Sequence, residues 1–578
     1  MVIGGRTGWP VGRLGLVSDA TEVSVERLAE VRGASVSAAV RASALPTLRS
    51  RRSSLHERLR RLREQAHTER WLTWEHDEPV SEAATRVTKA ALGVMIVVSL
   101  WIASVAAAHP SFLSPTAHVG YYPFWLSGPL GPLMSWHNFG THALEGIFTW
   151  GVAAMYIAYA AVLICSPRLH PRWPLMAMVA LQLIWFLSPP MPLTDIFNYL
   201  NYGRMEVVHH LNPYTTIPEL EPHTDPTFAL SNWHGLESPY GPLFTLITFA
   251  VVPLGTTGSY WMMKTLLLAT SLASVYMLWR CADLLGRNKL GAALFLGLNP
   301  IVLVWGMGAD HNDFLMMLVI ITAMYLLLRA QVGRARARSG TVPVERAAGA
   351  RARASTALAW LDGSGRPIVR GEPRLWWELG AGLALAAAVA LKASAAILLP
   401  VIIAGSTRRL RLVASFLVGL AAFGAMAYAA FGANPPNLAQ QAALVIPLGI
   451  PNLTGYILGF GGETIGWRIA IEFGLVAAIV ICTVAAARRR DWLVPAAWVT
   501  FALLVTLSWV LPWYLIWLLP FAALARTRRL RVAALLLGVY LFLGWMPYAS
   551  TFWHDIGFNP STTITGRADA RYLHTLLN

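Results

Sequence analysis

The chain has 578 residues, of which 56% are hydrophobic and only 13% are charged. Soluble globular proteins carry roughly twice that charged fraction, so the composition excludes a string of soluble domains as well as disordered and collagen-like chains. Cys165, Cys281 and Cys482 lie in apolar stretches or at their ends, which argues against a disulfide framework and a zinc site. The net charge of +16 indicates a nucleic-acid partner only if the charge forms a patch.

The N-terminal residues 1–86 are polar and rich in arginine, and they lack the apolar core of a secretory signal. A helical pattern runs from Ser54 to Trp71, with leucines on one face and arginines around it. Two interpretations stay open, a helix that lies on an anionic bilayer surface and a solvated tail. In either case we predict a partly disordered cytoplasmic tail.

From Ala90 onward, apolar runs long enough to cross a bilayer follow one another. We predict an all-α polytopic membrane protein with about 13 transmembrane helices, some of them paired as hairpins because their runs are shorter than the ~20 residues that a span prefers. The runs are residues 90–108, 143–165, 174–189, 259–281, 290–307, 312–330, 376–391, 394–405, 412–431, 466–487, 492–511, 513–525 and 531–547.

The loops between these runs differ in charge. Arginines gather in the loops of one side, whereas loops 109–142 and 433–465 contain no lysine or arginine and loop 190–241 contains only Arg204. By the positive-inside rule the N-terminus is cytoplasmic and the C-terminal tail lies outside, provided that 242–255 does not span. The positive charge therefore reflects topology, and we expect no nucleic-acid partner.

This topology predicts five segments. They are the tail 1–86, a catalytic transmembrane module 87–330 with outer loops 109–142 and 190–258, a basic cytoplasmic loop 331–375, transmembrane helices 376–547 and an outer-face tail 548–578. Interfacial helices are expected in the outer loops. The chain has no internal repeat, which argues mildly against a secondary transporter.

Asp195 belongs to the densest group of polar and aromatic residues and directly follows an apolar run, so it should lie just outside the bilayer. On a helix, Asp195, Tyr199 and Tyr202 would share one face. Burial beside aromatic rings would raise the pKa of this carboxyl, which suits a general base. The alternative is that Asp195, or Thr194 before it, only caps the helix.

A second polar cluster, Asp310-His311-Asn312-Asp313, lies between two opposed runs on the outer side. One short turn supplies few oxygens for a hard cation, so we expect no metal ion. His311 is expected to offer a proton-bearing nitrogen to an anion, and a simple helix-capping turn is the alternative.

Further candidates lie at the outer ends of apolar runs. Lys392 interrupts an apolar sequence and either reaches the bilayer interface or meets an anion. Tyr214 and Tyr240 lie in proline-rich turns, where they could stack on a sugar ring, line a lipid groove or only punctuate the loop. Tyr514 lies at an outward turn where interfacial aromatic residues are common.

One outer carboxylate beside cationic groups suits transfer of a sugar from a lipid phosphate better than hydrolysis of a glycoside. A phosphate is a good leaving group, so positive groups that stabilise its charge suffice and one base must remove the acceptor proton. Glycoside hydrolysis needs two carboxylates because its leaving group is poor.

Taken in order, these features resemble the GT-C superfamily of glycosyltransferases, and more narrowly the actinobacterial α-(1→6)-mannopyranosyltransferases that build the mannan core of lipomannan. The resemblance covers about residues 88–547 and rests on Thr194-Asp195-Ile-Phe-Asn-Tyr, Tyr202-Gly-Arg204, Asn212-Pro-Tyr214, Ser238-Pro-Tyr-Gly-Pro242, His311-Asn-Asp313 and Pro512-Trp-Tyr514. The family often has two acidic residues after the early span, whereas Asn198 follows Asp195 here, which argues against a metal-dependent variant.

The resemblance implies an inverting mannosyltransferase of the plasma membrane with its active site on the outer face. Its donor would be polyprenol-phosphate-mannose, its acceptor a lipid-anchored mannan or glycolipid among membrane lipids, and no cofactor is expected. Asp195 matches the catalytic carboxylate, and Arg204, His311 and Lys392 fall where donor-phosphate contacts are expected. The other expected substrate-binding residues are Tyr199, Tyr202, Asn312, Tyr240 and Tyr514.

Other activities stay open at this point. A GT-C transferase could use another lipid-linked sugar, such as arabinofuranose, or form another mannosyl linkage. A lipid or sugar transporter is the alternative from another class. A transporter should carry ionisable groups at mid-membrane depth, whereas here they gather at the outer ends of the apolar runs.

Overall fold

The computed structural model describes residues 79–109, 111, 113, 123–134, 139–339, 375–489 and 491–577. Within these ranges the chain forms helices and loops and contains no β-strand. The expectations for residues 1–78 and for most of the basic loop 331–375 lie outside the described residues. For the rest of the chain, the prediction of an all-α polytopic membrane protein is confirmed.

In the described chain, six segments are long and apolar enough to cross a bilayer. They are α2 (Glu82–Ala108), the segment Thr141–Arg168 with α4 (Thr141–Cys165), the helical segment Pro242–Leu284 that ends with α8 (Gly255–Leu284), the first part of α10 (Asp313–Ser339), α14 (Arg409–Phe431) and α17 (Ile465–Arg489). Shorter apolar helices are α5 (Arg172–Leu187), α9 (Lys289–Gly297), α12 (Leu375–Leu391), α13 (Leu399–Gly405), α18 (Leu493–Thr506), α19 (Leu515–Leu524) and α20 (Arg528–Trp545). Each apolar run predicted from the sequence coincides with one of these helices or with a helix and a short 3-10 or π segment beside it.

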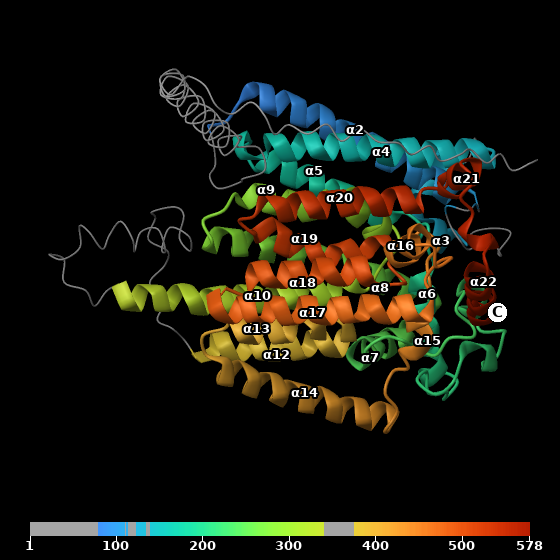
Figure 1. Cartoon of the computed structure of the whole chain (residues 1–578). Coiled ribbons are helices and arrows are strands. Elements are labelled where there is room, and N and C mark those ends of the chain that lie inside the picture. Colours follow the sequence, from blue (N-terminus) through green and yellow to red (C-terminus); the bar gives the residue numbers. More distant parts are fainter. Residues whose placement is uncertain are drawn as a thin grey trace, which may run out of the picture. The chain divides into compact units, whose positions relative to one another are not determined.

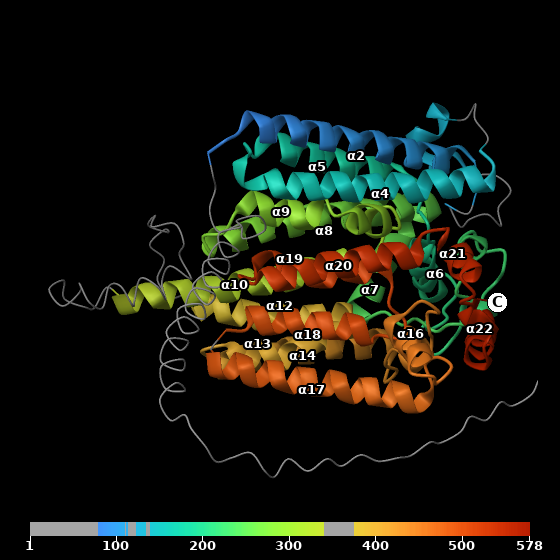
Figure 2. The ribbon, with the colours of Figure 1, turned by 45° about the horizontal axis from the view of Figure 1, so that its top comes forward.

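The long helices lie side by side in a bundle (Figures 1 and 2). α2 packs against α4 and α5, α12 against α10 and α14, and α17 against α13 and α18. α19 lies inside the bundle, because every one of its residues is buried. Helices can approach closely where glycine replaces a larger side chain: a Cβ on Gly382 of α12 would lie only 2.6 Å from the carbonyl oxygen of Leu412 in α14.

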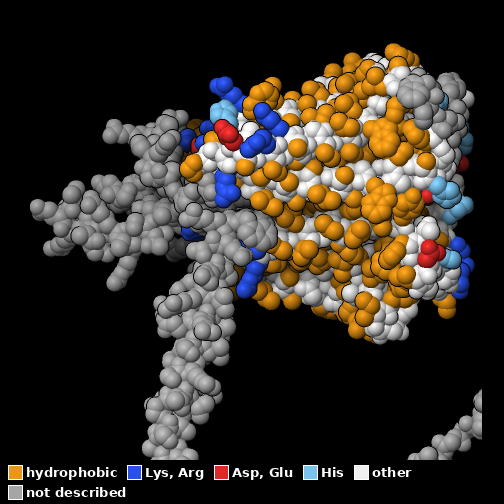
Figure 3. Space-filling model, turned by 90° about the horizontal axis from the view of Figure 1, so that it is seen from above, with side chains coloured by type: hydrophobic (Ala, Val, Ile, Leu, Met, Phe, Trp, Pro, Cys, Tyr) orange, Lys and Arg blue, Asp and Glu red, His pale blue; other side chains and the backbone are white. Residues whose placement is uncertain are grey.

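The outside of the bundle is apolar. Trp150, Ile157 and Phe473 are each more than 70% exposed, although large apolar side chains are normally buried in soluble proteins. Figure 3 shows hydrophobic side chains over the middle of one face and charged side chains toward its ends. A surface of this kind suits contact with lipid tails.

The segments predicted on the outer side meet at one end of the bundle, at the right in Figures 1 and 2. They form α6 (Asp195–Val207), α15 (Ala439–Ala442), α16 (Ile450–Ile457), α21 (Ala549–Asp555) and α22 (Ile564–Leu577). α7 (Pro242–Val251) is a helix of its own, because the chain breaks before α8 at Gly255, where φ is +73°. The expected topology requires such a break, and which side of a membrane this end faces stays a prediction.

Candidate active site

A cavity of about 210 Å³ lies at this end of the bundle. Its walls come from segments far apart in the chain, namely α6, the turn before α10, the segment after α12, the turn before α19 and α22. Apart from Arg204, every residue that the resemblance implied to be catalytic or substrate-binding lines it, whereas the further candidate Tyr214 does not. The predicted residues that line it are Asp195, Tyr199, Tyr202, Tyr240, His311, Asn312, Lys392 and Tyr514.

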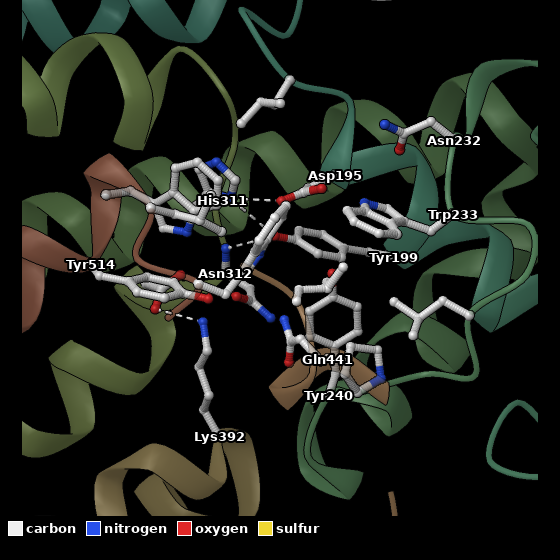
Figure 4. Close-up of a pocket in the computed structure, with 18 of the residues that line it drawn as sticks. Asp195, Tyr199, Asn232, Trp233, Tyr240, His311, Asn312, Lys392, Gln441 and Tyr514 are labelled. Carbon is white, nitrogen blue, oxygen red and sulfur yellow. Dashed lines mark hydrogen bonds and ion pairs between the residues drawn. The ribbon is translucent and has the colours of Figure 1, made fainter. Parts of the chain in front are cut away.

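Asp195 is the first residue of α6, and its side chain is 16% exposed toward the cavity (Figure 4). One carboxylate oxygen accepts a hydrogen bond from the Asn198 amide at 3.3 Å. The oxygen of the same amide accepts the backbone N–H groups of Asn232 and Trp233 at 3.1 and 3.3 Å, which ties Asp195 to the loop that follows α6. Among the described residues, the Thr194 hydroxyl caps nothing and finds no hydrogen-bond partner, so the capping alternative gains no support from it.

The pKa of the Asp195 carboxyl is raised to about 6. Burial raises it, whereas the charge of Lys392 and the hydrogen bond from Asn198 act in the opposite direction. At neutral pH the group is therefore ionised and still basic enough to accept a proton. These are the properties of a general base.

His311 lies beside this carboxylate. Its Nδ1 is 3.3 Å from Asp195 Oδ2 and 3.3 Å from the Tyr199 hydroxyl, and its ring stacks on Trp513 with centroids 3.5 Å apart. Burial, helped by the charge of Lys392, lowers the pKa of His311 well below its usual value. The imidazole is therefore neutral, and it is placed to orient Asp195 through Nδ1, while Nε2 has no hydrogen-bond partner in the part of the protein that the structure describes.

Lys392 follows α12 and points into the cavity. Its Nζ lies 2.8 Å from Asp313 Oδ1 and about 5 Å from the ring centroids of Tyr514 and Trp517, which stack on each other. Of the two interpretations made from the sequence, contact with an anion fits better than contact with the bilayer interface. The Asp313 carboxylate and the two rings hold the ammonium in the cavity wall. Among the described residues that line the cavity, Lys392 alone is a lysine or arginine.

The aromatic residues of α6 and the following loop form a packed group. The Tyr199 ring meets the Tyr240 ring edge to face at 4.9 Å, and the Tyr202 hydroxyl donates to the Leu236 carbonyl at 2.7 Å. The Tyr199 hydroxyl also accepts the backbone N–H of Asn312 at 3.4 Å. Tyr214 lies outside the cavity and supports Tyr240, whose carbonyl accepts its hydroxyl at 2.8 Å.

Arg204 does not line the cavity, so the structure gives the expected donor-phosphate contact no support. Its guanidinium pairs with the buried carboxylate of Asp225 at 2.8 Å, and His209 approaches the same carboxylate at 2.7 Å. Burial alone would raise the pKa of Asp225, but hydrogen bonds from Arg204, the Thr227 backbone and His209 lower it to about 2. Arg204 therefore anchors the loop after α6. Its ion pair with Asp225 forms only when that loop is folded.

We expect Arg204→Met to lower stability by about 3 kcal/mol, because it leaves Asp225 as a buried charge without its strongest partner. Thermal unfolding of the purified protein in detergent measures this loss. The donor KM of the folded variant should change by less than about threefold, since Arg204 lies off the cavity. A donor KM raised more than about tenfold at unchanged thermal stability would return Arg204 to the binding site.

A buried ion pair lies beneath the site and was missed from the sequence. Lys264 of α8 donates from Nζ to Asp310 Oδ2 and to the Ser188 carbonyl, both at 2.9 Å, and both charged side chains are buried. Asp310 has a left-handed backbone with φ of +56° and directly precedes His311. The pair thus holds the turn that presents His311 and Asn312. A lone lysine within the apolar sequence of residues 259–281 was the available signal.

We expect Lys264→Met to destabilise the protein by about 3–5 kcal/mol, because it leaves the Asp310 carboxylate buried without its cation. Lys264→Met combined with Asp310→Asn should recover much of that loss, since no charge is then left unpaired. Thermal unfolding of the two variants measures the difference. A double variant no more stable than the single one would contradict this role for the pair.

Sequence reasoning also missed several residues of the cavity wall. Asn232, Trp233 and Leu236 come from the loop after α6, whereas Gln441, Leu444, Trp509, Trp545, Leu573 and Leu577 come from the second half of the chain. None of them stands in a motif. The expected topology places most of their segments on one side, but which of their side chains reach the cavity depends on how the helices and loops pack.

The part of the chain that the structure describes shows no metal-binding site. No group of three or more His, Cys, Asp or Glu side chains there is arranged to hold an ion. Asp310 and Asp313, considered as ligands from the sequence, instead pair with Lys264 and Lys392. A reaction without a metal ion stays a prediction.

Comparison with known proteins gives two kinds of match. Residues 117–408 match a protein family described as "Alpha-(1->6)-mannopyranosyltransferase, N-terminal domain". Alpha-(1->6)-mannopyranosyltransferase A of Mycobacterium tuberculosis is 27% identical over 435 residues, which cover 72% of this chain and 78% of that protein. Alpha-(1->6)-mannopyranosyltransferase Rv1459c of the same organism is 27% identical over 411 residues, which cover 61% of this chain and 66% of that protein.

No solved structure matches the chain significantly. The matched region contains Asp195, His311 and Lys392, which line the cavity. The resemblance inferred from the motifs is thereby confirmed. The chain belongs to the alpha-(1->6)-mannopyranosyltransferase family of GT-C glycosyltransferases.

Proposed function

We propose that this protein transfers mannose from polyprenol-phosphate-mannose to a lipid-anchored mannan or glycolipid and forms an α-(1→6) linkage with inversion. The observation that carries the proposal is Asp195, a carboxylate whose pKa is raised to about 6 at the wall of a cavity that also contains Lys392. The names of the mycobacterial relatives support the sugar and the linkage. The donor lipid and the inversion rest on the chemistry below.

In the proposed reaction the acceptor hydroxyl loses its proton to Asp195 while its oxygen attacks the anomeric carbon of mannose. The bond from that carbon to the phosphate oxygen breaks, and its electron pair leaves with the lipid phosphate. A single displacement from the opposite face inverts the anomeric carbon. Lys392 stabilises the charge that develops on the phosphate, and His311 orients the carboxylate of Asp195.

The test is an assay with purified protein, polyprenol-phosphate-mannose and a short α-(1→6)-mannoside, with and without a chelator. We expect mannose transfer that the chelator does not inhibit, and an α-(1→6) bond in the product by NMR. Parallel reactions with a lipid-linked arabinofuranose test the alternative donor. No transfer from polyprenol-phosphate-mannose, or a bond at another hydroxyl, would contradict the proposal.

We infer further that the protein lies in the plasma membrane with this cavity outside and the N-terminus in the cytoplasm. The charge distribution supports this orientation, because loops 109–142 and 433–465 contain no lysine or arginine. Ile564 of α22 is 79% exposed, so Ile564→Cys should react in intact cells with a membrane-impermeant thiol reagent. Labelling that appears only after the cells are lysed would contradict the orientation.

A further inference from the structure

The C-terminal helix α22 forms part of the cavity wall. Leu573 and Leu577 face the cavity, and Leu576 between them is buried in an apolar cluster with Leu236 and Leu444, which also line the cavity. Trp233 and Trp509 pack against the same cluster. The last helix of the chain is thus joined to the site through side chains from two other loops.

Polar contacts attach α22 at several points along its length. Gly235 donates its backbone N–H to the Leu576 carbonyl at 3.0 Å, and the Tyr572 hydroxyl donates to the Gln440 carbonyl at 3.0 Å. A Cβ at Gly235 would lie only 2.3 Å from the Thr575 carbonyl oxygen, so the close approach of α22 requires glycine there. The hydroxyl of Thr565, in the first turn, donates to the Gly461 carbonyl at 2.8 Å.

The cavity has two chemically different sides, with Asp195 between them. His311, Tyr514 and Lys392 lie on one side in Figure 4, and Asn232 and Trp233 lie on the other. A departing lipid phosphate requires the side of Lys392, because that ammonium is the permanent positive charge among the described lining residues. The acceptor sugar would occupy the side of Trp233, where the indole rings of Trp233 and Trp509, 6.2 Å apart, and the amide of Asn232 suit a carbohydrate. α22 covers this second side.

We propose that Leu573 and Leu577 of α22 limit the space for the acceptor and so determine which acceptor length the enzyme prefers. The cavity of about 210 Å³ is smaller than the roughly 300–1,000 Å³ of typical ligand sites, so an oligosaccharide end must share the space with these leucines. This inference rests on the proposed function, since it concerns the acceptor of that reaction. The proposal gives the tail 548–578 a role in substrate selection, whereas the sequence predicted only that this tail lies on the outer face.

The test compares a dimannoside and a tetramannoside, both α-(1→6)-linked, as acceptors with polyprenol-phosphate-mannose as donor. The measured quantity is the ratio of kcat/KM for the long acceptor to that for the short one. Leu573→Ala with Leu577→Ala should raise this ratio at least about fivefold, because the added space admits the longer glycan. Leu577→Trp, which fills the space, should lower the ratio.

Ile564→Ala is the matched control, because Ile564 lies on the same helix and is 79% exposed. It should leave the ratio unchanged, and size-exclusion elution and thermal unfolding should match those of the parent in all variants. Leu577 is the last described residue, so Leu577→Ala alone tests the proposal should the double variant fail to fold. A ratio that stays constant, or equal changes for both acceptors, would overturn the proposal. A parent protein inactive with both acceptors would instead overturn the proposed function.

Discussion

Replacing Asp195 with asparagine should lower the turnover number of mannose transfer by about 10²–10⁴-fold, the usual contribution of a general base. Asparagine keeps the size of the side chain and can still contact Asn198 and His311, but it cannot accept the acceptor proton. The donor KM should therefore change little, and the loss should appear in kcat. Initial rates at saturating donor and acceptor measure it.

The matched control is Glu219→Gln, which removes a carboxylate from the same outer loop at an exposed position. It should retain parental turnover. The two variants should unfold at similar temperatures, so that a lower rate of Asp195→Asn cannot be ascribed to loss of the fold. Near-parental turnover of Asp195→Asn would remove Asp195 from the reaction.

The pH profile of the parent enzyme tests the same role independently. Because the pKa of Asp195 is raised to about 6, its basic form predominates above that pH and is lost as the pH falls through it. kcat/KM should be level above this value and fall by about tenfold per pH unit below it. This acidic limb should be absent from the residual activity of Asp195→Asn.

Replacing Lys392 with methionine should lower kcat/KM by about 10²–10³-fold, the range found when one preorganised group that stabilises developing charge is removed. The reason is that the described lining residues include no other lysine or arginine to take over the departing phosphate. Lys392→Arg should recover part of the activity, because it restores the charge with another shape. Steady-state kinetics with varied donor measure both effects.

Lys392→Met also leaves the buried Asp313 carboxylate without its cation, so stability must be measured beside activity. Lys392→Met with Asp313→Asn removes both charges and should unfold at a higher temperature than Lys392→Met, while remaining equally inactive. Lys289→Met is the matched control, since Lys289 makes a partly exposed pair with Asp283 away from the cavity. An active double variant would show that Lys392 serves only to pair Asp313.

The sequence alone was sufficient to predict the helical bundle and the end at which the site lies. Long apolar runs in a bilayer have helix as their stable form, because no solvent there satisfies backbone polar groups. The distribution of arginine predicted a common side for the segments that carry Asp195, His311 and Lys392. The structure brings these side chains to one cavity, because segments at the same end of a bundle can meet only there.

Which side chains touch was decided by the tertiary structure. Arg204 pairs with Asp225, and Lys264 pairs with Asp310, through contacts that no local pattern encodes. Leu573 and Leu577 join the cavity more than 370 residues after Asp195, through an apolar cluster that neighbouring loops complete. Periodicity and charge specify a helix and its side because they act along the chain. A pairing between distant segments depends on how the helices pack, and only the folded molecule sets that distance.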